Sequence, residues 1–308
     1  MPLEVIFLGT GGSMPTRKRS LPSIAVRREG EIILFDCGEG TQRQAATAKL
    51  STLRISRIFI THLHGDHVLG LPGLIQSMAL LGRTTLLEIY GPTGLASFLE
   101  AVRLTVPCSI GYPISVYEAS EGTLYEDAKY KVEAAWMDHT IPCLGYSLTE
   151  KPRPGRFKPE VAERLGIPKG PLWRRLQMGE TVEVAGRTVH PSRVVGPPRP
   201  GAKLSYSGDT RPNLNLRKIA YRSDLLIHDS TFDESRRDKA AEYGHSTARQ
   251  AAQMAREVKA SSLALTHISP IYEDSEEKLL LEAEEALGGN VVLASDLSHL
   301  NVQPRQTI

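Results

Sequence analysis

The sequence predicts an α/β fold in which two facing β-sheets lie between outer layers of helices, as an αββα sandwich. Two observations predict this fold. Short apolar runs typical of strands alternate with helical stretches in both halves of the 308-residue chain. In both halves, polar side chains stand directly after apolar runs, where α/β sheets gather their functional residues. A hydrophobic content of 41% is ordinary for a globular protein and is sufficient for a buried core.

The predicted elements of the first half are short and are separated by glycine, proline or polar turns. The first apolar run ends in the glycine-rich turn 9–12, which is too irregular for a nucleotide-binding fingerprint. We expect strands at residues 5–8, 32–35, 58–60, 88–90, 131–136 and 144–149, and helices at 41–48, 70–81 and 94–102.

The second half repeats this alternation, with strands expected at 225–228, 262–267 and 291–294 and helices at 247–258 and 276–287. Ser275 is the expected N-cap of the last helix, and Gly288 and Gly289 are its stop. Because the two halves are alike, we predict a single domain over residues 1–308 rather than two domains in a row.

Residues 151–201 differ from the rest of the chain. Nine prolines occur between Lys151 and Gly201, and a long proline-rich insertion in a compact domain is usually a binding loop or a linker. A short helix at 158–165 and the apolar Leu172, Trp173 and Leu176 predict a protruding arm with a small core of its own. The alternative is a surface loop without function.

Charge and cysteine content favour a cytoplasmic protein with basic patches. The net charge is only +2, but basic residues cluster at 17–19, at 27–28 and along 151–175. Such clusters fit either RNA binding or solvated surface loops. Cys37, Cys108 and Cys143 are odd in number, so they cannot all pair internally. No stretch approaches the ~20 apolar residues of a membrane span, so we expect no membrane contact.

The densest functional signal is the run His62-Leu63-His64-Gly65-Asp66-His67, between a predicted strand and a predicted helix. Packing does not require three imidazoles and a carboxylate on one turn, and these groups are the ligands that zinc prefers. His62 and His64 point the same way in an extended stretch and can bind one ion. Asp66 and His67 lie beyond the turn and can reach a second ion.

Three more candidate ligands, His139, Asp209 and His267, each follow a short apolar run. If these runs are strands of the two sheets, their ends bring the three side chains to the same edge as the His62–His67 run. Seven ligands would then fill two neighbouring metal sites, with Asp209 as the bridging carboxylate.

The order of these motifs resembles the ribonuclease Z family of tRNA 3′-processing endonucleases, which have the metallo-β-lactamase fold. The resemblance extends from about Leu8 to Asp296 and includes residues 35–42, the run Ser207–Pro212, the run Gly244–Thr247, the run Leu265–Ser269 and the insertion 151–201. It implies a zinc-dependent endoribonuclease that removes the 3′ trailer from precursor tRNA and leaves a 3′-hydroxyl on the tRNA. The insertion would be the exosite that binds tRNA, and the protein would be a homodimer.

The resemblance also implies a role for each candidate residue. His62, His64 and His139 would bind one zinc ion, Asp66, His67 and His267 the other, and Asp209 both; manganese could replace zinc. A metal-activated hydroxide would attack the scissile phosphate. Asp66 and His245 are the expected catalytic residues: Asp66 accepts a proton from the attacking water, and His245 donates one to the leaving oxygen or orients the phosphate. We expect Glu242 to hold the ring of His245.

The remaining polar candidates have structural interpretations. His228 ends a buried strand and is expected to be a core histidine with hydrogen-bond partners. His190 is expected at the surface, and His299 near the site or in the C-terminal tail. Asp36 is expected to hydrogen-bond the His62–His67 loop.

Two other functions compete with tRNA processing. One is a general phosphodiesterase of the same fold that acts on small substrates, for which residues 151–201 bring no benefit. The other is an RNA-binding protein that is stabilised by metal but has no turnover. Asp66 and His245 argue against the second, because metal retention alone needs no proton donor.

Overall fold

The computed structural model describes residues 3–305, which fall into two compact units. The larger unit comprises residues 3–149 and 202–303, and the smaller unit comprises residues 150–201 together with 304 and 305. Within the described range, no helix is both long enough and apolar enough to span a lipid bilayer.

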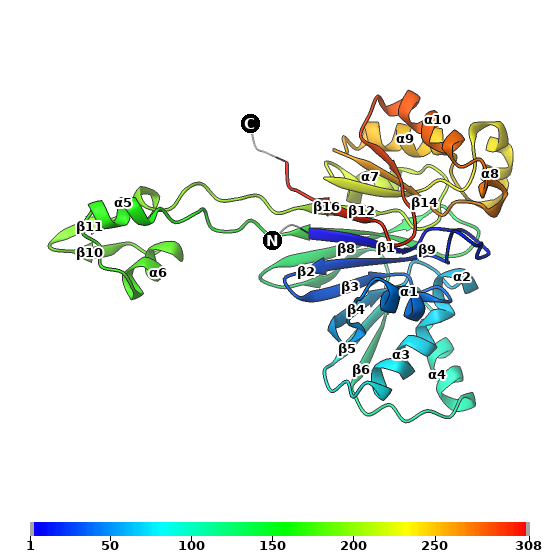
Figure 1. The fold of residues 1–308 in the computed structure, drawn as a ribbon, viewed down its shortest axis with the longest axis horizontal. Helices are drawn as coiled ribbons and strands as arrows, with labels where there is room; N and C mark the ends of the chain where they lie inside the picture. Colours follow the sequence, from blue (N-terminus) through cyan, green and yellow to red (C-terminus); the bar gives the residue numbers. More distant parts are fainter. Residues whose placement is uncertain (1–2, 306–308) are drawn as a thin grey trace. The chain divides into compact units, whose positions relative to one another are not determined.

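In the larger unit, the described residues form two seven-stranded sheets that pack face to face, with helices on their outer sides (Figure 1). The predicted αββα sandwich is confirmed. The first sheet contains, in spatial order, β16 (His299–Val302), β1 (Leu3–Gly9), β2 (Ser23–Arg28), β3 (Glu31–Phe35), β4 (Ile55–Phe59), β5 (Leu87–Gly91) and β6 (Ile114–Glu118). The second contains β15 (Val291–Leu293), β14 (Leu263–Thr266), β13 (Leu225–Asp229), β12 (Lys203–Tyr206), β9 (Cys143–Glu150), β8 (Tyr130–Met137) and β7 (Gly122–Glu126).

An apolar layer fills the space between the two sheets. The rings of Phe35 and Phe59 stack 5.5 Å apart on the first sheet, and Tyr146 of the second sheet packs against both. Along β4, Phe59 faces this layer, whereas its neighbour Ile58 belongs to the outer cluster that packs under the helices. The two-residue period of a strand explains how every central strand contributes to two apolar layers.

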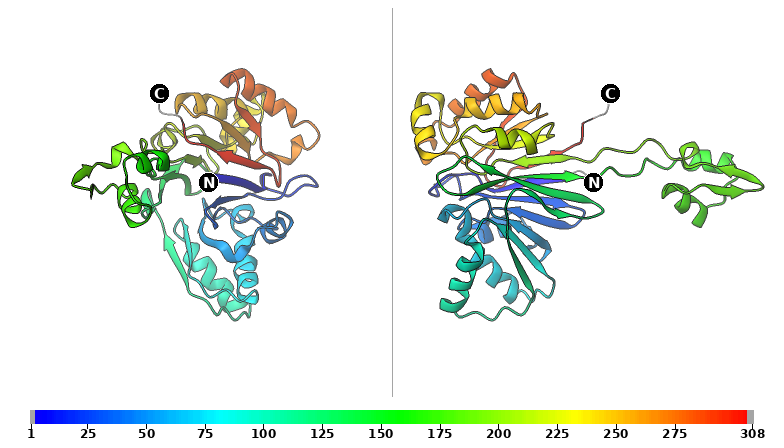
Figure 2. Two further views of the ribbon diagram at one scale, coloured as in Figure 1. Left: turned by 60° about the vertical axis from the view of Figure 1, so that its left-hand side comes forward. Right: turned by 180° about the vertical axis from the view of Figure 1, so that it is seen from behind.

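The helices lie on both outer sides of the sandwich, as the additional views in Figure 2 confirm. On the side of the first sheet are α1 (Thr41–Thr47), α2 (Gly65–Val68), α3 (Gly70–Leu80) and α4 (Leu95–Thr105). On the side of the second sheet are α7 (Leu214–Ala220), α8 (Arg237–Tyr243), α9 (Ala248–Glu257) and α10 (Glu277–Leu287).

The start of α10 differs from the prediction. Its N-cap is Glu276, without a side-chain cap, so the prediction of Ser275 as N-cap is wrong. The N–H of Ser275 already bonds the carbonyl of Tyr272, because tight turns run from Pro270 into the helix and leave no extended cap position. The helix ends at Leu287 and has Gly288 as its C-cap, which agrees with the predicted stop.

Parallel pairing brings the ends of several strands to a common edge. The strands β3 to β6 are parallel neighbours in the first sheet, and β12 to β15 are parallel neighbours in the second. The loops that leave their carboxyl ends therefore emerge on the same side of each sheet.

The smaller unit has its own apolar cluster, in which Ala162, Leu176 and Val189 are buried. Trp173 packs on Phe157 with ring centroids 5.0 Å apart, and its indole N–H donates to the carbonyl of Ile167. The elements of this unit are α5 (Pro159–Arg164), α6 (Pro171–Gln177), β10 (Val182–Val184) and β11 (Arg187–Val189).

Candidate metal centre

All seven predicted ligands follow strands of the larger unit. His62 and His64 follow β4, and Asp66 and His67 lie in the first turn of α2. The other three follow strands of the second sheet: His139 follows β8, Asp209 follows β12 and His267 follows β14. Folding brings these residues together, and they fall into overlapping groups whose ligand atoms lie within 4.8 Å of one another.

The first group consists of His62, His64 and His139. His62 Nε2 lies 3.0 Å from His64 Nδ1, which in turn lies 3.2 Å from His139 Nε2. Three ring nitrogens from two sheets therefore converge on one point. Neutral imidazoles bind metal ions, and burial keeps these three neutral because it lowers the pKa of each ring.

The second group consists of Asp66, His67 and His267. Asp66 Oδ2 lies 3.5 Å from His67 Nε2 and 3.4 Å from His267 Nε2. The backbone N–H of Ser13 donates to the same carboxylate oxygen at 2.8 Å. Ser13 adopts a left-handed backbone with φ of 63°, which is rare outside glycine and is found where a structure holds a functional group in place.

Asp209 lies between the two groups. Its Oδ2 is 3.7 Å from His62 Nε2, 3.4 Å from His67 Nε2 and 3.2 Å from His267 Nε2. Burial by itself would raise the pKa of Asp209, but the surrounding imidazoles, His267 and His67 foremost, hold it well below its usual value. An ionised carboxylate in this position can contact ions on both sides.

Several buried atoms of these residues fit a metal centre better than a hydrogen-bond network. His67 Nε2, His267 Nε2 and Asp209 Oδ1 are buried and have no hydrogen-bond partner among the described residues. Unpartnered polar atoms are costly in a protein interior, and the two ring nitrogens lie 3.4 Å and 3.2 Å from Asp209 Oδ2. Coordination to metal ions would satisfy such atoms, so the chemistry of this donor set fits a metal site.

The outer nitrogen of each of four ligand rings is held by a neighbouring group, which turns the other nitrogen toward the centre. His67 Nδ1 lies 2.8 Å from Asp36 Oδ2. Contacts of the same kind join His62 Nδ1 to Thr61 Oγ1 at 2.9 Å, His139 Nδ1 to the Gly244 carbonyl at 2.8 Å and His267 Nδ1 to Thr231 Oγ1 at 2.8 Å. Such partners orient metal-binding histidines and set their tautomers.

Asp36 supports the whole His62–His67 loop. One of its oxygens accepts the backbone N–H of Thr61 at 2.7 Å, and the other accepts the hydroxyl of Tyr206 at 2.9 Å. The predicted hydrogen bonding between Asp36 and this loop is confirmed. Close packing also leaves no room for a side chain at Gly12, because a Cβ added there would lie 2.5 Å from the ring of His267.

His245 lies at the edge of the same cluster, but its partner is not the one that we expected. His245 Nδ1 lies 2.9 Å from Asp229 Oδ2, whereas Glu242 is exposed on α8. The prediction that Glu242 holds the ring is wrong, because α8 ends at Tyr243 and the chain then turns His245 inward to the end of β13. Burial opposes protonation of His245, but Asp229 outweighs it and raises its pKa to about 9.

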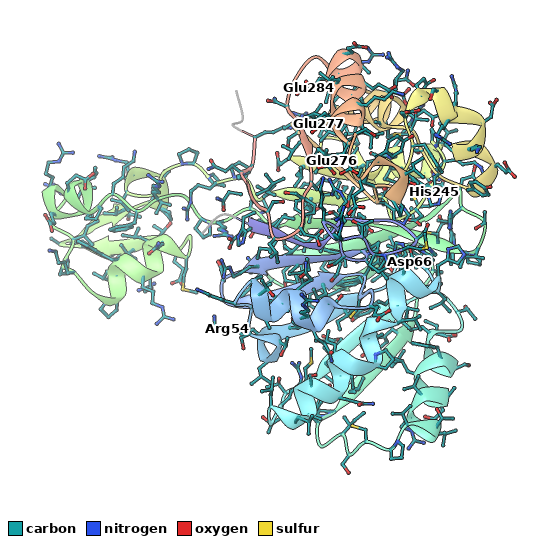
Figure 3. All side chains as sticks on the ribbon, turned by 45° about the vertical axis from the view of Figure 1, so that its right-hand side comes forward. Arg54, Asp66, His245, Glu276, Glu277 and Glu284 are labelled. Atoms are coloured by element: carbon teal, nitrogen blue, oxygen red, sulfur yellow. The ribbon has the colours of Figure 1, made fainter. Side chains whose placement is uncertain are left out.

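Asp229 is the residue that sequence reasoning missed. It is fully buried, and its other oxygen accepts the hydroxyl of Thr231 at 2.6 Å. Asp229 therefore contacts both His245 and Thr231, the residue that holds the ring of His267. The sequence signal was its place at the end of β13, two residues after the last apolar residue Ile227, because a polar residue close behind an apolar run also identified Asp209. Figure 3 shows Asp66 and His245 at the same end of the larger unit, on elements of opposite halves.

The other histidines lie outside the centre. His228 is buried, as predicted, but only its Nδ1 contacts a protein acceptor, the carbonyl of Asp229 at 2.7 Å; its Nε2 has no partner in the described part of the chain. His190 is exposed in the smaller unit, as predicted. His299 is neither near the site nor in a loose tail, since it begins the edge strand β16 and contacts Glu4 at 2.8 Å.

The basic loop at residues 17–19 lies against the acidic residues Glu273, Asp274 and Glu276. Arg19 is only 5% exposed, and its guanidinium donates to Glu276 at 2.6 Å. Lys18 Nζ donates to the carbonyl of Glu273, and the backbone N–H of Arg17 donates to the carboxylate of Glu273. Arg19 is therefore not part of a free cationic patch, although the sequence allowed that interpretation, whereas the side chain of Arg17 stays 85% exposed.

Comparison with known proteins finds relatives along almost the whole chain. Ribonuclease Z of Methanosarcina mazei is 46% identical over 303 residues, which cover 98% of this chain and 99% of that protein. Ribonuclease Z of Methanothermobacter thermautotrophicus is 46% identical over 98% of this chain and 97% of its own length. Ribonuclease Z of Bacillus licheniformis is 41% identical over 96% of this chain and 97% of its own length.

Solved structures confirm the predicted fold. The short form of human tRNase Z has a TM-score of 0.71 and 30% identity, covering 97% of this chain and 99% of its own. The metallo-β-lactamase-fold protein YhfI of Bacillus subtilis has a TM-score of 0.70 at 16% identity over 97% of this chain and 99% of its own, which bears on the fold alone. The family model described as "Anti-Pycsar protein Apyc1" matches residues 3–105.

The match to the three ribonuclease Z relatives spans both sheets, every predicted ligand and the inserted unit, at 41–46% identity. The resemblance that the motifs predicted is confirmed: the chain belongs to the ribonuclease Z family.

Proposed function

We propose that the protein is a zinc-dependent endoribonuclease that removes the 3′ trailer from precursor tRNA and leaves a 3′-hydroxyl on the tRNA. The observation that carries this proposal is the convergence of seven histidine and aspartate ligands beside His245, in a chain whose relatives are ribonuclease Z over nearly their full length. The short form of human tRNase Z, at 30% identity, supports tRNA as the substrate.

Two zinc ions would be held by the two groups of ligands. His62, His64 and His139 would bind one ion and Asp66, His67 and His267 the other, with Asp209 in contact with both. When bound, the pair of ions lowers the pKa of a water toward neutrality and offsets negative charge on the phosphate. The predominance of imidazole ligands favours zinc over magnesium or calcium, and manganese is the alternative ion.

Asp66 and His245 would move the protons of the reaction. Asp66 is held ionised, since contacts with His267 and His67 overcome the effect of burial and lower its pKa, so it can accept the proton of the attacking water. His245 is kept protonated by Asp229 and can donate to the leaving 3′-oxygen. The new P–O bond stays with the trailer as a 5′-phosphate, and the broken P–O3′ bond leaves the hydroxyl on the tRNA.

The smaller unit would bind tRNA. Its exposed surface carries Arg156, Lys158, Arg164 and Arg174, for which phosphate groups are the natural partners. We further propose a homodimer in which the arm of one subunit serves the site of the other. The three cysteines are free, which supports a reducing, cytoplasmic location.

The test is cleavage of a 3′-extended precursor tRNA, mapped to the nucleotide, with wild type, Asp66→Ala and Asp238→Ala in parallel. Asp238 is an exposed aspartate of α8 and serves as the matched control. We expect one cut at the junction of tRNA and trailer in the wild type and the control, and none in Asp66→Ala. Metal-dependent turnover of bis(p-nitrophenyl) phosphate without any cut in tRNA would instead identify a general phosphodiesterase.

A further inference from the structure

Arg211 follows the central ligand Asp209 by two residues and contacts two other loops of the site. Its side chain is 29% exposed, and it lies in the turn between β12 and α7. The chemistry proposed above does not use this arginine. Its hydrogen bonds nevertheless reach two loops of the site, one that carries His139 and one that carries His245.

The first contact is with the loop that carries His139. The backbone N–H of Arg211 donates to the carbonyl of Asp138 at 2.8 Å, and its Nη1 donates to the Asp138 carboxylate at 3.0 Å. Because Asp138 directly precedes His139, these two bonds fix the backbone from which that imidazole extends.

The second contact is with the loop that carries His245. Arg211 Nε donates to the carbonyl of Ala241 at 2.5 Å, and Nη2 lies 3.4 Å from the carbonyl of Glu242. These carbonyls belong to the last turn of α8, where backbone oxygens lack helical partners and a cation is favoured. The chain then continues through Gly244 to His245.

The two loops also touch each other at Gly244. Its carbonyl accepts from His139 Nδ1, and a Cβ added to Gly244 would lie 2.7 Å from that nitrogen. Gly244 also has φ of 81°, a left-handed backbone that favours glycine. A side chain at this position would therefore both clash with His139 and strain the backbone. The rings of His139 and His245 are consequently held with their centroids 5.1 Å apart.

We propose that Arg211 is a positioning residue that clamps the His139 loop to the His245 loop, and so sets the distance between a metal ligand and the proton donor. The inference rests on the proposed function for the roles of these two histidines. Asp138 and two carbonyls already occupy donors of the guanidinium and offset its charge, which favours positioning over a direct phosphate contact. The planar, forked guanidinium suits this geometry, and a lysine ammonium cannot reproduce it.

The variants are Arg211→Gly, Arg211→Lys and Asp138→Asn, with Arg217→Ala as the matched control. Arg217 is an arginine of α7 that pairs with Glu257 and has no contact with either loop in the described structure. Thermal melting of each variant monitors folding. Asp138→Asn removes the ion pair while keeping a side-chain acceptor, so it retains a test if Arg211→Gly fails to fold.

Three measurements read out the clamp. They are kcat and KM for precursor tRNA and for bis(p-nitrophenyl) phosphate, zinc content after dialysis, and the NMR signal of the His139 Nδ1 proton. We expect kcat to fall about 10–100-fold for both substrates in Arg211→Gly, as for other residues that orient metal ligands. The kcat of Arg211→Lys should be nearly as low as that of Arg211→Gly, and the kcat of Asp138→Asn should fall less. Added guanidinium should restore part of kcat in Arg211→Gly. The His139 proton signal should shift or broaden.

A rise in KM for tRNA with kcat unchanged would overturn the clamp in favour of a substrate contact. An unchanged His139 signal together with unchanged kcat would overturn it as well. If the wild type cleaves only the small phosphodiester, the proposed tRNA function fails by itself, and the proton signal and zinc content still decide the role of Arg211.

Discussion

The metal-binding edge of the larger unit and the smaller unit 150–201 use charged residues in opposite ways. At the edge, His62, His67, Asp209 and Asp229 are all buried, and each contacts other polar groups. In the smaller unit a small apolar cluster is buried, while arginines and lysines lie at the surface. The energy of a buried charge depends strongly on its particular partners. A single exposed charge contributes little, so exposed charges matter mainly through how many of them there are. Substitutions at the edge should therefore affect chemistry, and substitutions in the smaller unit should affect binding.

The largest effect is expected for Asp209→Ala, which removes the carboxylate between the two ligand groups. Because metal ions supply several kcal/mol of charge stabilisation, kcat should fall roughly 10³-fold or more on both substrates. Single-turnover rates and zinc content by mass spectrometry are the measurement. Chelation of the wild type should give the same loss, and re-addition of zinc should restore only the wild type. Full activity of the variant would remove Asp209 from the site.

The next effect is expected for Asp229→Asn, which keeps the shape of the side chain but removes the charge that holds His245 protonated. General acid catalysis contributes typically 10²–10⁴-fold, so kcat should fall by about 10²-fold while zinc content stays the same. Steady-state kinetics and zinc analysis check this together. The matched variant Glu242→Gln should behave as wild type, because Glu242 does not hold the ring. A fall of kcat in Glu242→Gln, with unchanged kcat in Asp229→Asn, would instead show that Glu242 holds the ring of His245.

A smaller effect, confined to binding, is expected for Leu176→Ala in the smaller unit. Leu176 is fully buried there, and loss of a buried leucine costs about 2–5 kcal/mol. We expect faster proteolysis within residues 150–201 and a higher KM for precursor tRNA. Turnover of bis(p-nitrophenyl) phosphate should stay the same. A parallel loss of small-substrate turnover would show that the two units do not separate chemistry from binding.

The smallest effect is expected for Arg174→Ala, which removes one exposed charge from α6. Loss of one phosphate contact should weaken tRNA binding evenly and reduce the slope of log K against log salt by about 1. Binding isotherms at several salt concentrations measure that slope. Arg54, which Figure 3 labels on the larger unit, provides the control: Arg54→Ala should leave the slope unchanged. An equal change in both variants would assign tRNA binding to general surface charge.

The sequence by itself determined the αββα architecture and seven clustered ligand candidates. Period-two apolar runs have to bury one or both faces of a sheet, and residues after parallel strands have to share an edge. Hence His62, His64, Asp66 and His67 could be read from one loop, and His139, Asp209 and His267 from their places after strands.

Only the tertiary structure decided which polar groups meet across long stretches of chain. The sequence places Glu242 three residues from His245, but packing at the end of β13 gives the ring to Asp229 instead. It also places Arg19 in a basic loop, whereas packing buries Arg19 against Glu276. The physical reason is that hydrogen bonds and ion pairs depend on distance in space, and local sequence patterns carry no information about partners on other elements.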